Sequence, residues 1–91
     1  MLHVIKSTQS LKLVTALDAS QDVILLVEDA IYAAVPDHKL HKILENINVY
    51  VLDADVIARG CTKKVGKALK MIGYDGFVDL TEQHSSVITW P

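Results

Sequence analysis

Runs of consecutive apolar residues predict the strands of a sheet. The clearest run is Val23–Val27, in which all five residues are apolar and three are Val or Ile. A segment that is apolar on both faces is typical of a parallel strand covered on both sides. Leu2–Ile5 and Asn48–Leu52 have similar patterns and are predicted as further strands. Lys70–Ile72 is predicted as a weaker fourth strand.

Helical patterns fill the segments between these strands. Ser7 or Thr8 can accept a hydrogen bond from the first turn of a helix, and Gly60 suits the position just after a helix end. The first helix has a partial apolar stripe made of Leu11, Val14, Ala16 and Leu17. The remaining helices are predicted at 30–35, 37–44, 53–59, 63–69 and 77–84, and residues 85–91 are expected to form a tail.

The alternation of strands and helices predicts an α/β fold. Such an order implies a parallel sheet with right-handed crossovers. We expect a small doubly wound, mostly parallel sheet of four or five strands, with helices on both faces. No linker, internal repeat or low-complexity stretch interrupts the pattern, so residues 1–91 are expected to form a single domain.

The short length and apolar composition predict that the chain works with a partner. A domain of 91 residues buries only about 60–65% of the surface of its unfolded chain, so its own core is small. Cys61 is the only cysteine, which excludes an internal disulfide, and no Cys/His spacing suits structural zinc. Hydrophobic residues make up 51% of the chain. This surplus is expected to form an exposed interaction patch.

Charge and hydropathy narrow the class of protein further. The net charge of -2 gives no general attraction to nucleic acid or anionic membranes. No apolar run has the roughly 18 residues of a membrane span, and the first residues do not resemble a signal peptide. We therefore expect a cytoplasmic protein without cofactor, metal, membrane association or direct nucleic-acid binding.

Three stretches of the chain resemble the TusB/DsrH family of the DsrE/F/H-like superfamily. The segment Val49–Gly60 contains Leu-Asp-Ala-Asp-Val-Ile-Ala-Arg-Gly, and Ile72–Thr81 contains Tyr-Asp-Gly-Phe-Val-Asp-Leu-Thr. Val23–Ala34 is the third stretch. His84, Trp90 and the opening Met1–His3 also fit. Together these matches cover most of the chain in the order and spacing of the family.

The resemblance implies an accessory subunit of a TusBCD-like sulfur relay, and not an enzyme. Family members form a heterohexamer with TusC-like and TusD-like subunits, two copies of each. The complex passes persulfide sulfur between TusA-like and TusE-like carriers, toward 2-thiolation of the tRNA wobble uridine. The reactive cysteine belongs to the TusD-like subunit. An alternative is a DsrEFH-type subunit in dissimilatory sulfur oxidation, but the first helical segment lacks the cysteine that some DsrH chains carry there.

Cys61 is the one candidate nucleophile. It follows Gly60 and precedes Thr62, which can start a helix whose N-terminus, together with Lys63 and Lys64, would favour a thiolate. On this reading Cys61 carries a persulfide. The alternative is a small buried apolar side chain, which is common for a free cysteine. We favour the second interpretation, because no histidine or second cysteine lies nearby in the sequence and relatives generally have bulkier residues there.

Two charged clusters are candidate interaction sites. At helical spacing Lys63, Lys67 and Lys70 would share one face, as a docking patch for an acidic partner or for tRNA, or simply as a solvated face. Glu28 and Asp29 follow the strongest strand, at the end where open α/β sheets bind ligands. The sequence offers no nearby base or nucleophile, so we expect Asp29 to cap the next helix instead.

Overall fold

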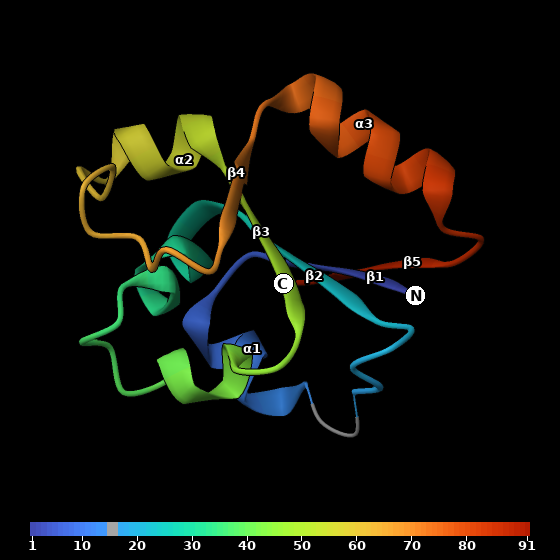
Figure 1. Cartoon of the computed structure of the whole chain (residues 1–91), viewed down its shortest axis with the longest axis horizontal. Coiled ribbons are helices and arrows are strands. Elements are labelled where there is room, and N and C mark those ends of the chain that lie inside the picture. Colours follow the sequence, from blue (N-terminus) through green and yellow to red (C-terminus); the bar gives the residue numbers. More distant parts are fainter. Residues whose placement is uncertain (15–16) are drawn as a thin grey trace.

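The computed structural model describes residues 1–14 and 17–91, and within them the strands form one parallel sheet. The strands are β1 (Leu2–Ile5), β2 (Val23–Leu26), β3 (Asn48–Leu52), β4 (Lys70–Ile72) and β5 (Val87–Trp90). Their order across the sheet is β4-β3-β2-β1-β5, with every neighbouring pair parallel. Figure 1 shows the whole molecule viewed down its shortest axis, with the strands of the sheet crossing its centre. The predicted α/β fold with a parallel sheet is confirmed.

The helical segments are short, apart from the last. They are α1 (Thr8–Leu13), η1 (Glu28–Ala34), η2 (His41–Leu44), α2 (Asp53–Ala58) and α3 (Tyr74–Gln83), where η marks a 3-10 helix. Ser7 caps α1 as predicted, because its Oγ accepts a hydrogen bond from the Ser10 N–H at 3.1 Å. Gly60 has φ +65 just after α2, a left-handed conformation that glycine adopts without strain.

The order of the strands decides which face each helix covers. The connections from β1 through β4 always step one strand in the same direction, whereas the chain after β4 returns to the far side of β1. Right-handed crossovers therefore place α1, η1, η2 and α2 on one face and α3 on the other. We call these the first face and the second face. This is the predicted doubly wound arrangement with helices on both faces.

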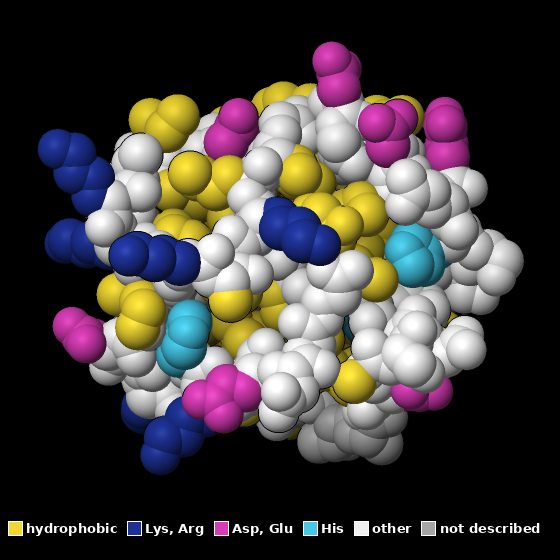
Figure 2. All heavy atoms as spheres, viewed as in Figure 1, with side chains coloured by type: hydrophobic (Ala, Val, Ile, Leu, Met, Phe, Trp, Pro, Cys, Tyr) yellow, Lys and Arg dark blue, Asp and Glu magenta, His cyan; other side chains and the backbone are white. Residues whose placement is uncertain are grey.

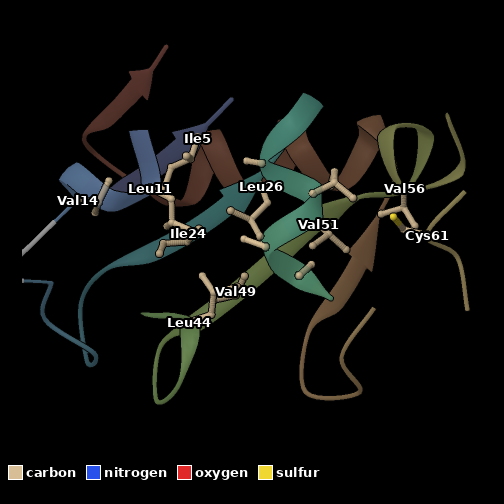
Figure 3. Packing of buried hydrophobic residues seen from close by; sticks show 14 residues of the cluster. Ile5, Leu11, Val14, Ile24, Leu26, Leu44, Val49, Val51, Val56 and Cys61 are labelled. Atoms are coloured by element: carbon tan, nitrogen blue, oxygen red, sulfur yellow. The ribbon is translucent and has the colours of Figure 1, made fainter. Parts of the chain in front are cut away.

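Two buried clusters follow from this layering. The first face has the larger cluster (Figure 3). In it, Ile5 of β1 and every second residue of β2 and β3 pack against α1, η1, η2 and α2. The second face has a smaller cluster, in which Leu2, Val4 and Leu25 pack under Leu80 and Phe77 of α3. Because, among the described residues, only the ten-residue helix α3 covers this face, the face remains exposed near the edge strands β4 and β5.

Two helical predictions are wrong, and a third differs in type and boundaries. Residues 37–44 form turns and the short 3-10 helix η2 instead of an α-helix. Their backbone hydrogen bonds join residues three apart, for example from the His41 N–H to His38 O at 3.0 Å, and not four apart. Residues 63–69 form turns. Gly66 donates its N–H to Ala34 O at 2.9 Å, which ties this segment to η1 instead of to its own preceding turn. The segment predicted at 30–35 is the 3-10 helix η1, which begins at Glu28.

The ends of the chain also differ from the prediction. The expected tail contains β5, which pairs with β1 from Leu2↔Val87 to Ile5↔Trp90. Of the predicted apolar stripe of the first helix, Leu11 and Val14 are buried and Leu17 is partly buried, whereas Ala16 lies outside the described residues. In the part of the chain that the structure describes, no helix is long and apolar enough to cross a membrane.

Candidate functional site

A pocket of about 370 Å³ lies at the carboxyl edge of the sheet, beside α3. Its apolar lining comes from β1, from the ends of β2 and β3 and from α3, and its polar lining comes from residues after β1, β2 and β3 and from α3 and β5. The apolar residues are Val4, Val27, Leu52 and Phe77, and the polar ones are Lys6, Glu28, Asp55, Tyr74 and Thr89. Ligands of open α/β sheets bind at this edge. The pocket is therefore the candidate binding site.

The turn after β2 has an unusual backbone at the pocket. Glu28 has φ 49, a left-handed conformation that costs energy for a residue other than glycine. Its N–H donates a hydrogen bond to Asp55 Oδ2 at 2.7 Å, across 27 residues of sequence. A bond to a carboxylate is stronger than one to a neutral acceptor. Asp55 therefore stabilises the turn that presents Glu28 to the pocket.

Arg59 connects the same turn to α2. Its Nη2 lies 3.0 Å from Asp29 Oδ1, and its Nε donates to the same oxygen at 3.1 Å. Its Nη1 lies 3.7 Å from Asp55 Oδ1, one helical turn earlier in α2. Arg59 and Asp55 are each 20% exposed, while Asp29 is 72% exposed. Asp29, Asp55 and Arg59 thus form an ion-pair network that joins the β2 turn to α2.

The prediction that Asp29 caps a helix is wrong. The residues before η1 and α2 are Val27 and Leu52, and neither helix has a side-chain capping bond. Asp29 pairs with Arg59 instead. No sequence pattern predicts that these residues meet, although two of the family-like stretches contain them. The i,i+4 spacing of Asp55 and Arg59 was a usable signal, but the link to Asp29 spans 30 residues.

The pocket can bind polar groups but has no side chain suited to sulfur chemistry. Lys6 supplies a cation, and Glu28 and Asp55 supply carboxylates. Among the described residues that line it there is no cysteine or histidine. No group of three metal-ligating side chains occurs anywhere in the described ranges, 1–14 and 17–91. The arrangement is suited to recognition of a mixed polar and apolar segment.

Cys61 lies away from this pocket, in the core of the first face. It is 4% exposed and packs beside Val56 (Figure 3). Its Sγ donates to the Arg59 carbonyl oxygen at 3.4 Å. The helix expected to begin at Thr62 is replaced by turns, so no helix N-terminus favours a thiolate. A separate pocket of about 340 Å³ reaches Cys61 and includes Arg59 and Lys64.

The lysine cluster is exposed, but its residues do not share a helical face. Lys63 and Lys67 lie in turns and Lys70 begins β4. Lys70 Nζ donates to Asn48 Oδ1 at 3.3 Å and lies 5.1 Å from the centroid of the Tyr50 ring. In Figure 2, Lys and Arg side chains gather on the side where Figure 1 places the segment after α2, and carboxylates gather over α3. Docking through the lysines stays a prediction.

Comparison with known proteins identifies the family. The family described as "DsrH like protein" matches residues 6–87, and the chain belongs to this family. Among curated proteins, "Protein TusB" of Yersinia pestis (strain Pestoides F) is 38% identical over 76 residues, which cover 81% of this chain and 80% of that protein. "Protein TusB" of Yersinia pseudotuberculosis serotype O:1b (strain IP 31758) has the same identity and coverage. The resemblance expected from the three sequence stretches is confirmed.

Solved structures support the same fold. The ychN protein from E. coli superimposes with a TM-score of 0.77 at 18% identity, covering 97% of both chains. Protein Tm0979 from Thermotoga maritima superimposes with a TM-score of 0.65 at 23% identity, covering 94% of this chain and 97% of that one. At these identities the similarity concerns the fold.

Proposed function

We propose that this chain is an accessory subunit of a cytoplasmic sulfur relay and performs no sulfur chemistry of its own. Its assembly would resemble TusBCD, with TusC-like and TusD-like subunits, and would serve 2-thiolation of the tRNA wobble uridine. The observation that carries the proposal is the burial of the only thiol in a chain of this family. A persulfide carrier must present its sulfur to two successive partners, and Cys61 is 4% exposed.

The exposed apolar side chains support a role in assembly. Leu13, Ile57 and Tyr74 are each more than 60% exposed, and Val78 is 53% exposed. They lie on α1, α2 and α3, so apolar surface is presented by several elements. Apolar surface of this kind favours association. Association also stabilises a short domain, because the apolar surface buried against related subunits adds to the area buried in its own small core.

The pocket beside α3 gives the subunit a means to recognise a partner. Lys6, Glu28 and Asp55 place charges of both signs around an apolar floor. The Asp29–Arg59–Asp55 network holds the turn that bears Glu28. A rigid polar rim around apolar residues is typical of protein recognition sites. On this proposal the carrier proteins that deliver and receive sulfur, TusA-like and TusE-like, dock on the assembled complex.

The test replaces one thiol at a time in the co-expressed complex. Cys61→Ser is expected to leave assembly and the 2-thiouridine content of tRNA near wild type, measured by gel filtration and by mass spectrometry of tRNA nucleosides. The matched control is the corresponding Cys→Ser change in the TusD-like subunit, which is expected to abolish thiolation. If Cys61→Ser abolishes thiolation while the complex remains intact, the chain is a persulfide carrier and the proposal is wrong.

Deletion of the gene for this chain separates the tRNA branch from sulfur oxidation. A cell that lacks this chain is expected to lose 2-thiouridine and to regain it when the wild-type gene is restored. Unchanged 2-thiouridine in that cell would contradict the tRNA role. A defect in sulfur oxidation in its place would identify a DsrEFH-type subunit.

A further inference from the structure

The outer edge of β5 is one of the two unpaired edges of the sheet that the described residues form. The strand lies at the end of the order β4-β3-β2-β1-β5, and nothing among the described residues pairs with its outer side. Its inner side bonds to β1: the N–H of Leu2 donates to Ser86 O at 3.0 Å, and the N–H of Lys6 donates to Trp90 O at 3.2 Å. Alternate residues point the same way, so the N–H and C=O groups of Val87 and Thr89 point outward.

Charge distinguishes this edge from the opposite one. Edge strands of natural proteins are often protected by charged residues, above all lysine, or by proline within the strand. At the other end of the sheet, β4 contains Lys70 and follows Lys67. The segment 84–91 contains no Asp, Glu, Lys or Arg, and its proline, Pro91, lies after the last residue of β5. Val87 and Ile88 are 44% and 38% exposed. Two copies of the β5 edge can therefore approach without charge repulsion and with apolar side chains to bury.

We propose that the outer edge of β5 pairs in antiparallel fashion with β5 of a second copy of this chain. Val87 and Thr89 lie symmetrically about Ile88, so a two-fold axis at Ile88 places Val87 opposite Thr89 of the other copy. Each opposed pair exchanges both of its N–H···O=C bonds, which gives four bonds in total. The two Ile88 side chains then face each other on the first face. An interface that uses the same patch twice is the isologous type of two-fold dimers.

The geometry of this pairing predicts a cross-link. Ile88 and its symmetry mate form a non-hydrogen-bonded antiparallel pair, whose Cα atoms lie about 4.5 Å apart. This distance is within the range of about 4.4–6.8 Å that a disulfide spans. Ile88→Cys in a Cys61→Ser background is therefore expected to form a disulfide-linked dimer under a mild oxidant. Met71→Cys in the same background is the control, because Met71 lies on the same face of the opposite edge strand and is 48% exposed.

A second variant tests the association without a covalent bond. Ile88→Lys places two cations face to face at the two-fold axis and is expected to weaken dimerisation at least about 10-fold, as measured by sedimentation velocity over a range of protein concentrations. Met71→Lys is the matched control and is expected to leave the dimer unchanged. Both side chains are already partly exposed, so the fold is expected to tolerate lysine at either position, which circular dichroism checks.

The purified wild-type chain decides the outcome. The proposal is wrong if the wild-type chain remains monomeric up to about 1 mM. It is also wrong if Ile88→Lys dimerises as well as Met71→Lys, or if Ile88→Cys cross-links no better than Met71→Cys. Cross-linking of Ile88→Cys to a co-expressed related subunit, in preference to a second copy, would also overturn it. These measurements need no thiolation assay, so their result is independent of the proposed relay function.

Discussion

Removal of the Asp55 carboxylate tests whether it holds the strained turn after β2. Asp55→Ala deletes the acceptor that lies 2.7 Å from the Glu28 N–H and one of the two carboxylates near Arg59. A hydrogen bond to a charged group contributes about 1.5–3 kcal/mol. The Arg59 contact at 3.7 Å is a longer, partly exposed ion pair that adds at most about 1 kcal/mol. We expect Asp55→Ala to lower the free energy of unfolding by about 2 kcal/mol.

This loss is large for so small a domain. A chain of 91 residues has a total stability of about 5–14 kcal/mol. Since each 1 kcal/mol shifts the melting temperature of a domain of this size by about 4–8 °C, we expect a decrease of about 8–16 °C. Urea unfolding followed by the fluorescence of Trp90 measures the change, because the Trp90 indole donates to His3 Nδ1 at 3.1 Å only in the folded chain.

Two further variants complete the test of Asp55. Asp53→Ala is the matched control, because Asp53 lies in the same first turn of α2, and we expect it to cost less than about 0.5 kcal/mol. Glu28→Gly keeps the N–H donor and relieves the left-handed conformation, so its stability is expected to equal or exceed that of wild type. Equal losses for Asp55→Ala and Asp53→Ala would refute the role of the bond between Asp55 and Glu28.

Other expectations follow from packing and charge. Leu80→Ala is expected to lower the free energy of unfolding in urea by about 2–4 kcal/mol, because Leu80 anchors α3 to the second face. Val78→Ala, on the exposed side of α3, is expected to lower it by less than about 0.5 kcal/mol. Similar losses for the two variants would contradict this packing. Charge reversal of Lys63, Lys67 and Lys70 together is expected to slow sulfur transfer without unfolding the chain, and wild-type transfer rates would reject the docking role. The Asp18 backbone N–H, which donates to Asp22, holds the pKa of Asp22 below its usual value of 3.8. Asp22→Asn is therefore expected to reduce thermal stability at neutral pH. The difference from wild type is expected to vanish as the pH falls through the lowered pKa of Asp22. A difference that persists at the lowest pH would show that the ionised Asp22 carboxylate is not its cause.

Local sequence signals were enough for β1 to β4 and for two of the helix ends. The apolar run at Val23–Val27 predicts β2 because consecutive apolar residues need cover on both faces. Ser7 and Gly60 mark helix ends through their own side-chain and backbone chemistry, and both predictions are confirmed. The alternation of elements predicts the parallel sheet with helices on both faces. Each of these signals acts within a few residues, so it can be read from the sequence.

Other features depend on contacts between distant segments. Residues 87–90 become a strand because β1 offers a free edge, although the two strands are more than 80 residues apart in sequence. The lysines after Cys61 lie in turns because Gly66 bonds to Ala34. Arg59 joins Asp29 only when α2 packs beside the β2 turn. Tertiary packing decided these features, because the free energy of a distant contact outweighs the weak local preference of a short segment.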